Sequence, residues 1–185
     1  AGYVNNPEAT EEKIRRDVFR DGDEYFDSGD LVQIHENDYF SFVDRLGDTF
    51  RWKSENVSTN EVSNIINRFG NMEDANVYGV EVPGMEGRCG MVAIKLLEGA
   101  EIDWEAFAAF VTEKLPPYAR PYFVRLRDEI DATNSFKQLK QKLQKEGFNP
   151  AIVKDPIYFL DPRVNTYVAL TEIIYEEIVS HQVRL

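Results

Sequence analysis

Short strand-like and helix-like segments alternate between about residue 45 and residue 150, and this order limits the possible folds more than any other feature of the chain. Aromatic and β-branched runs predict strands at residues 39–43, 49–52, 75–82, 89–97 and 122–126. Apolar residues at helical spacing predict helices at residues 58–70, 103–115 and 137–145. We therefore expect an α+β fold in which helices pack against a small sheet.

Local signals mark the ends of these elements. Ser58 and Glu61 have the spacing of a capping box, which predicts the start of the first of these helices. A Pro-Gly turn at residues 83–87 joins two strands, and Gly147 predicts the end of the last helix. The boundaries therefore agree with the periodicity.

The two ends of the chain have sequence patterns that differ from that of the region between them. Residues 8–19 have the charge pattern of a helix, with Ile14 and Val18 on one face. After Pro150 come an aromatic segment at residues 157–162 and a short amphipathic helix. We expect this tail to wrap back on the surface of a domain, because its aromatic content argues against disorder.

Composition excludes several classes of protein. With 185 residues, 43% of them hydrophobic, the chain can bury one ordinary core. A net charge of -12 argues against a nucleic-acid partner, because phosphate neutralisation needs a basic face. The one cysteine, Cys89, excludes an internal disulfide and is expected in the core, and His35 and His181 lack partners at metal-ligand spacing. From these cysteine and histidine positions we expect no metal site. The single cysteine fits a reducing compartment and no run is long and apolar enough for a membrane span, so we expect a cytoplasmic location.

Candidate binding residues gather between residues 25 and 62. Asp30 follows a Ser-Gly turn, where its carboxylate can meet a ligand hydroxyl, although such an aspartate often satisfies only its own backbone. Arg45 supplies a guanidinium close to the conformationally free Gly47. This segment can therefore bind a ligand and also bend, whereas an isolated arginine is more often part of a surface ion pair.

Several segments resemble motifs of the adenylate-forming ligases. YFDSGDL at residues 25–31 is similar to their Tyr-x-x-Gly-Asp-Leu motif, and DRLGDTFRWKSENVSTNEV at residues 44–62 is similar to the hinge motif that follows it. Together with TNSFK at residues 133–137 and DPIYFL at residues 155–160, they resemble the fatty acid transport protein and very-long-chain acyl-CoA synthetase family. The resemblance covers essentially the whole chain and implies the C-terminal portion of a longer parent protein.

The resemblance also implies a division of the chain. Residues 1–44 would be the terminal segment of the large N-terminal, AMP-binding domain, residues 45–150 the small C-terminal lid domain, and residues 151–185 a family-specific tail. The missing N-terminal domain, with its phosphate loop and acyl pocket, would be the main partner. Any membrane association would be made through the parent protein.

The implied activity is that of a fatty acid–CoA ligase. ATP and a long or very long fatty acid would give acyl-adenylate and pyrophosphate, and CoA would then displace AMP to form the thioester. Mg²⁺ is expected with ATP and would be bound mainly outside this chain. The chain alone is expected to be inactive.

Residue roles follow by matching the motifs. Lys137 would be the catalytic lysine, and Asp30 and Arg45 would bind the nucleotide. Gly47 and Asp48 would form the hinge. On the CoA side, the resemblance implies a group made of Arg51, Trp52, Lys53 and Ser54.

Some positions depart from the family pattern or allow a plainer interpretation. Ser54 stands where glycine is expected, and its side chain would crowd a ligand passing close by. Asn134 also replaces a glycine, which is a milder change because asparagine tolerates a left-handed backbone. Considered alone, Lys137 is more often a solvated helix lysine, like its neighbours Lys140, Lys142 and Lys145.

Two other functional classes fit the same sequence. A stand-alone nucleotide-binding or CoA-binding module would show measurable affinity for ATP or CoA without any further domain. A non-catalytic interaction domain would keep the fold but not the activity, and the joint presence of Asp30, Arg45 and Lys137 speaks against it.

Overall fold

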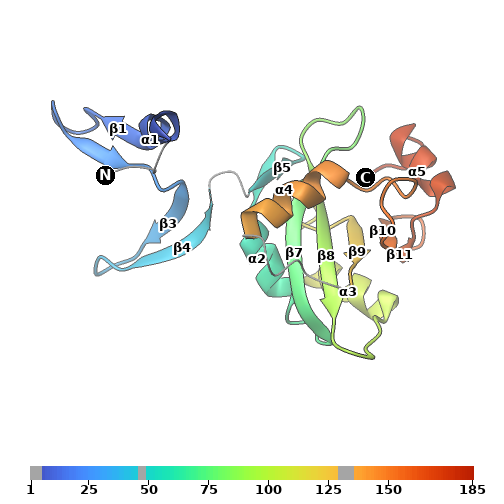
Figure 1. Cartoon of the computed structure of the whole chain (residues 1–185). Helices are drawn as coiled ribbons and strands as arrows, with labels where there is room; N and C mark the ends of the chain where they lie inside the picture. The colour runs from blue at the N-terminus through green and yellow to red at the C-terminus, as the bar shows by residue number, and fades with distance from the viewer. Residues whose placement is uncertain (1–5, 46–48, 129–135) are drawn as a thin grey trace. The chain divides into compact units, whose positions relative to one another are not determined.

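A computed structural model of the chain describes residues 6–45, 49–128 and 136–185 (Figure 1). The chain divides into two units, residues 1–47 and residues 48–185. The predictions about Gly47, Asp48 and Asn134 concern residues outside these ranges.

The first unit is built from local hairpins. Helix α1 (Pro7–Lys13) leads into strand β1 (Ile14–Arg16), which pairs antiparallel with β2 (Glu24–Phe26). Strand β3 (Asp30–Ile34) then pairs antiparallel with β4 (Phe40–Arg45).

The helix expected over residues 8–19 is therefore wrong beyond Lys13. The Asp23 carboxylate accepts hydrogen bonds from the backbone N–H groups of Val18, Phe19 and Arg20, at 2.8–3.0 Å. These bonds give the backbone an alternative to helical pairing, and Asp17 adopts a left-handed φ of 55°. The segment folds back as a hairpin for that reason.

The second unit begins with a small hairpin and a capped helix. Strand β5 (Phe50–Trp52) pairs with β6 (Glu55–Val57), whereas the strand expected at residues 39–43 pairs with β3. Helix α2 (Thr59–Ile66) starts at Ser58, whose hydroxyl accepts a hydrogen bond from the Glu61 N–H. The predicted N-cap is confirmed, although the helix ends before residue 70.

Within the described residues of the second unit, five strands form one mixed sheet in the order β11-β10-β9-β8-β7. Its strands are β7 (Met72–Val80), β8 (Cys89–Leu96), β9 (Phe123–Leu126), β10 (Ile157–Asp161) and β11 (Thr166–Ala169). The β8–β9 pair is parallel, and the crossover between them contains α3 (Trp104–Lys114). Helices α4 (Phe136–Glu146) and α5 (Glu172–Val179) complete the unit. From β5 to α4, the predicted strands and helices occur in the predicted order, and β6 is an additional strand that was not predicted.

The tail after Pro150 is part of the sheet. Strand β10 pairs antiparallel with β9, and β11 pairs antiparallel with β10. The expectation of a tail wrapped on the surface is therefore wrong for residues 157–169, whose aromatic and β-branched residues are typical of strands. The division into domains at residues 44 and 150 stays a prediction.

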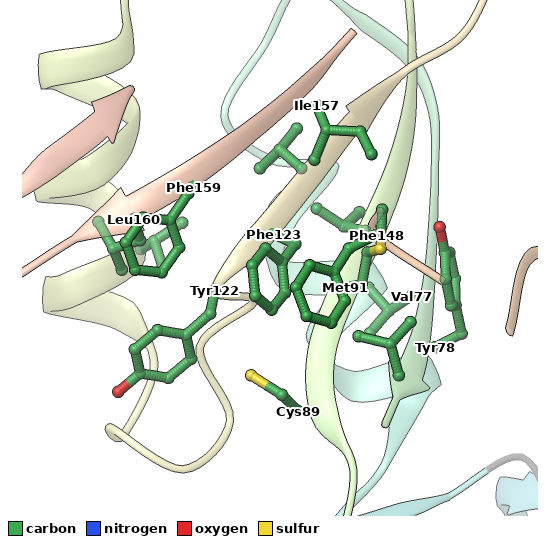
Figure 2. Packing of buried hydrophobic residues seen from close by; sticks show 14 of the residues in the cluster. Val77, Tyr78, Cys89, Met91, Tyr122, Phe123, Phe148, Ile157, Phe159 and Leu160 are labelled. Carbon is green, nitrogen blue, oxygen red and sulfur yellow. The ribbon is translucent and has the colours of Figure 1, made fainter. Parts of the chain in front are cut away.

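The core of the second unit is an apolar layer on the sheet (Figure 2). Tyr78, Met91, Phe123 and Phe159 lie in register on four adjacent strands, so their side chains share one face of the sheet. Phe148, just after α4, stacks on Phe123 with 4.2 Å between ring centroids. Cys89 is buried in the same cluster, as predicted, and this burial raises the pKa of its thiol.

Candidate functional site

The two residues assigned to the nucleotide lie on paired strand ends. Asp30 opens β3 and Arg45 closes β4, and the two are direct partners in the antiparallel register. The side chain of Arg45 lies outside the described residues. Residues far apart in sequence are thus brought opposite one another by the hairpin.

The turn before β3 is held by its own polar side chains. Gly29, with a φ of 74°, donates its backbone N–H to Asp27 Oδ1 at 2.9 Å, and the Asp30 N–H donates to Ser28 Oγ at 3.2 Å. Asp27 and Ser28 therefore supply the side-chain oxygens that stabilise this turn.

The turn between β5 and β6 explains why glycine is expected at position 54, where this chain has serine. Trp52 pairs with Glu55, so Lys53 and Ser54 form a two-residue turn, with φ values of 51° and 68°. Both central residues of such a turn are left-handed, which favours glycine at the second position. Glycine is thus expected at position 54 for backbone reasons as well as for ligand access.

The four residues of the expected CoA-side group separate in the structure. Trp52 is only 2% exposed and belongs to the core, whereas Arg51, Lys53 and Ser54 are exposed. The backbone at Arg51 is fixed by the Arg88 N–H, which donates to the Arg51 carbonyl at 2.7 Å. Gly87 is required in this contact, because a Cβ there would lie 2.3 Å from the same oxygen.

Lys53 has a partner that the sequence did not indicate. Its Nζ donates to the Tyr122 hydroxyl at 3.2 Å, across 69 positions of the chain. A shallow pocket of about 390 Å³ beside the turn is lined by Trp52, Lys53, Gly84, Met85, Glu86 and His181. The β5–β6 turn is therefore held against the sheet while keeping an open side.

Lys137 is the second residue of α4, and its side chain lies outside the described residues. Among the described side chains of this helix, Lys140 and Glu146 make polar contacts that anchor it. Lys140 is only 8% exposed and donates from Nζ to Thr59 Oγ1 at 2.8 Å, so the expectation of a solvated lysine there is wrong. At the other end, Glu146 Oε2 lies 2.6 Å from Arg125 Nη1.

Arg125 is the buried centre of an ion-pair cluster whose carboxylates are partly exposed. Arg125 is 6% exposed and also pairs with Asp155, with 2.7 Å between Nη2 and Oδ2. Burial acts to lower the pKa of Arg125, but hydrogen bonds to Glu146 and Asp155 outweigh it, and the pKa is raised. The charged form is therefore retained.

Neither histidine forms part of a metal centre in the described part of the chain. His35 shares a 2.7 Å hydrogen bond with Ser41 Oγ, and His181 lies against Gly84. Among the described residues, no group of three His, Cys, Asp or Glu side chains is placed to hold a metal ion. Within those same ranges, no helix has the length and apolarity needed to cross a bilayer.

Comparison with known sequences gives a consistent assignment. A model of the AMP-binding enzyme C-terminal domain matches residues 61–137. The chain is 47% identical over 184 residues to long-chain fatty acid transport protein 2 of Rattus norvegicus, covering 100% of this chain and 30% of that protein. It is 43% identical to long-chain fatty acid transport protein 3 of Homo sapiens, covering 100% of this chain and 27% of that protein. The chain thus spans less than a third of the length of these relatives.

Solved structures share the fold. ATP-bound MatB from Rhodopseudomonas palustris matches 76% of this chain and 27% of its own, with a TM-score of 0.62 and 23% identity. O-succinylbenzoate coenzyme A synthetase (MenE) from Bacillus subtilis, in complex with AMP, matches 77% of this chain and 27% of its own, with a TM-score of 0.61 and 19% identity. The α+β fold expected for the C-terminal domain of adenylate-forming ligases is confirmed. The family prediction is confirmed as well: the chain carries an AMP-binding enzyme C-terminal domain and resembles the long-chain fatty acid transport proteins along its whole length.

Proposed function

We propose that this chain is the C-terminal part of a fatty acid–CoA ligase that uses ATP to activate a long or very long fatty acid. The observation that carries the proposal is the register of β3 and β4, which sets Asp30 opposite Arg45. These are the two residues that the motifs assign to one nucleotide. Similarity to long-chain fatty acid transport proteins over the whole chain supports the choice of substrate.

The first half-reaction joins the fatty acid carboxylate to the α-phosphate of ATP and releases pyrophosphate. Asp30 accepts hydrogen bonds from the ribose hydroxyls, and Arg45 adds a guanidinium contact to ribose or phosphate. Lys137 presents its ammonium to the charge that builds on the carboxylate and phosphate oxygens. Mg²⁺ accompanies ATP, with its ligands mainly outside this chain.

The second half-reaction belongs to the other face of the small domain. The CoA thiol attacks the acyl carbonyl and AMP leaves. Arg51, Lys53 and Ser54 are exposed at the β5–β6 hairpin, where cations suit the phosphates of CoA, and Trp52 supports the hairpin from the core. The two faces alternate by rotation about Gly47 and Asp48, close to the division of the chain at residues 47 and 48.

The first unit belongs, in this proposal, to the large N-terminal domain of the parent protein. Phe19, Tyr39 and Phe40 are 78%, 73% and 68% exposed, far more than large aromatic residues in a finished core. Apolar side chains of this number pack in the complete protein on residues outside the chain. We place the parent in the cytoplasm, with any membrane contact made through its other parts.

A single substitution in the complete protein tests the nucleotide assignment. Asp30→Asn keeps the shape of the side chain but removes the charge that accepts two hydroxyl hydrogen bonds. We expect KM for ATP to rise about tenfold, the loss of one charged hydrogen bond. Asp38→Asn at the far end of the same hairpin is the matched control, because the left-handed backbone there suits asparagine. Equal KM values for the two variants would refute the role of Asp30.

A further inference from the structure

Lys140 is a buried lysine on the helix that carries Lys137. It lies three residues after Lys137, and its Nζ donates to Thr59 Oγ1 at 2.8 Å. Lys140 is 8% exposed and Thr59 is fully buried. Lysine is rarely buried, because removing an ammonium from water is costly. An apolar side chain could be buried at this position at a lower free-energy cost than the ammonium of Lys140.

This contact joins two elements that the proposed reaction uses in different steps. Thr59 is the first residue of α2, and only Ser58 separates it from the end of β6. Lys140 lies on α4, one helical turn from Lys137. The bond therefore connects the helix of the catalytic lysine to the base of the β5–β6 hairpin.

The rest of α4 is held independently. Leu143 is 1% exposed and packs in the core, and Glu146 pairs with the buried Arg125. These contacts fix the middle and the last turn of the helix. The Lys140 contact is the one nearest to the first turn among those described for α4, and first turns fray most readily because their N–H groups lack helical partners.

We propose that Lys140 is a positioning residue for Lys137. Through its hydrogen bond to Thr59, it fixes the first turn of α4 relative to α2, so that the Lys137 ammonium is presented to the reacting carboxylate and phosphate in one place. This inference rests on the proposed function. Lys140 acts through Lys137 and contacts no substrate itself.

The test uses the complete protein with Lys140→Met and Thr59→Val, each of which keeps side-chain bulk and removes one side of the bond. We expect kcat for adenylate formation to fall about 10- to 100-fold, the size of effect that a displacement of about 1 Å produces. KM for ATP and the rate of thioester formation from supplied adenylate should stay within about threefold. The double variant should be no slower than the slower single variant, because both remove one interaction.

Two further variants serve as controls. Thr59→Ser keeps the hydroxyl and should retain the rate of adenylate formation. Lys145→Met makes the same change as Lys140→Met at an exposed position of the same helix and should have no effect. If Lys140→Met fails to fold, Thr59→Val decides the matter, because valine reproduces the shape of threonine.

The outcomes separate this inference from the function on which it rests. Lys137→Ala is measured in parallel, and if adenylate formation survives it, the proposed function fails. If Lys137→Ala abolishes adenylate formation but Lys140→Met and Thr59→Val do not slow it, only the positioning role is overturned. Equal losses in both half-reactions, with a lower melting temperature, would make Lys140 merely structural and would also overturn it.

Discussion

The two units of the chain differ in how they use their apolar residues. In the described part of the chain, the cluster of buried apolar residues begins at Phe50, so it lies wholly in the second unit. The first unit instead exposes its large apolar residues, namely Val18, Phe19, Tyr25, Phe26, Leu31, Val32, Ile34, Tyr39, Phe40 and Phe42. The second unit thus has its own source of stability, whereas the first depends on local contacts.

The polar contacts of the first unit do not compensate. Arg16 pairs with Glu11 at 2.6 Å and Arg15 with Asp27 at 2.9 Å, but all four side chains are substantially solvated. Ion pairs this exposed are screened by water and add little to stability. Asp30 and Arg45, the residues proposed to bind the nucleotide, therefore lie on the unit without a core of its own.

The largest expected effect compares one aromatic residue from each unit. Phe123 is fully buried and stacked on Phe148, so Phe123→Ala should lower the free energy of unfolding by about 3–5 kcal/mol. Phe40 is 68% exposed, so Phe40→Ala should change it by less than about 0.5 kcal/mol. Denaturant unfolding of the chain measures both values. Similar losses for the two variants would show that the units share one core.

A smaller effect is expected at two left-handed turn positions. Ser54 in the second unit has a φ of 68°, and Asp38 in the first unit has a φ of 61°. Ser54→Gly relieves this strain and should raise the free energy of unfolding by about 0.5–1 kcal/mol. Asp38→Gly should leave the main transition unchanged, because its unit has no core that unfolds cooperatively. If Asp38→Gly shifts the midpoint of denaturant unfolding and Ser54→Gly does not, the first unit, and not the second, takes part in the cooperative transition.

The smallest effect concerns acid stability. Hydrogen bonds from Arg163 hold the pKa of the Asp161 carboxyl below its usual value. A carboxylate with a depressed folded pKa stabilises the protein above its unfolded pKa of about 3.9, and this is lost as pH falls through the folded pKa. Asp161→Asn should therefore slightly flatten the loss of stability below about pH 4, and the effect should be small because Arg163 is half exposed and its charge is screened by water. A thermal melt series from pH 2 to pH 6 measures this.

Asp27 in the first unit is the matched comparison. Its pKa is also lowered, mainly by a hydrogen bond from Arg15. Asp27→Asn should leave the acid dependence of the main transition unchanged, since that transition reports the second unit. A larger change from Asp27→Asn than from Asp161→Asn would contradict the separation of the units.

Much of the second unit could be predicted because its signals are local. The caps at Ser58 and Asp103 and the turn before Cys89 each fix an element end through neighbouring residues. The helix expected over residues 8–19 failed because the Asp23 carboxylate binds backbone N–H groups from several residues away. Periodicity does not reveal that competition.

The candidate site was predicted less completely, because its contacts join distant residues. The Asp30–Arg45 register needs the β3–β4 hairpin, and the Lys53–Tyr122 bond spans 69 positions. Lys140 could have been found, since it lies three residues before the buried Leu143, on the apolar stripe of α4. A lysine on such a stripe is a candidate for burial, whereas its exposed neighbours Lys142 and Lys145 lie off it.

The proposed function requires the two units, which have different roles, to move relative to one another between the half-reactions. Gly47→Pro in the complete protein fixes φ at this position and restricts Leu46, so it should lock the proposed hinge. Adenylate formation and CoA consumption from supplied adenylate would be timed separately, with a thermal melt to confirm folding. We expect a folded protein in which thioester formation falls by about tenfold or more, while adenylate formation is far less affected. If both rates stay within about threefold of those of the unmodified protein, the hinge is not at Gly47.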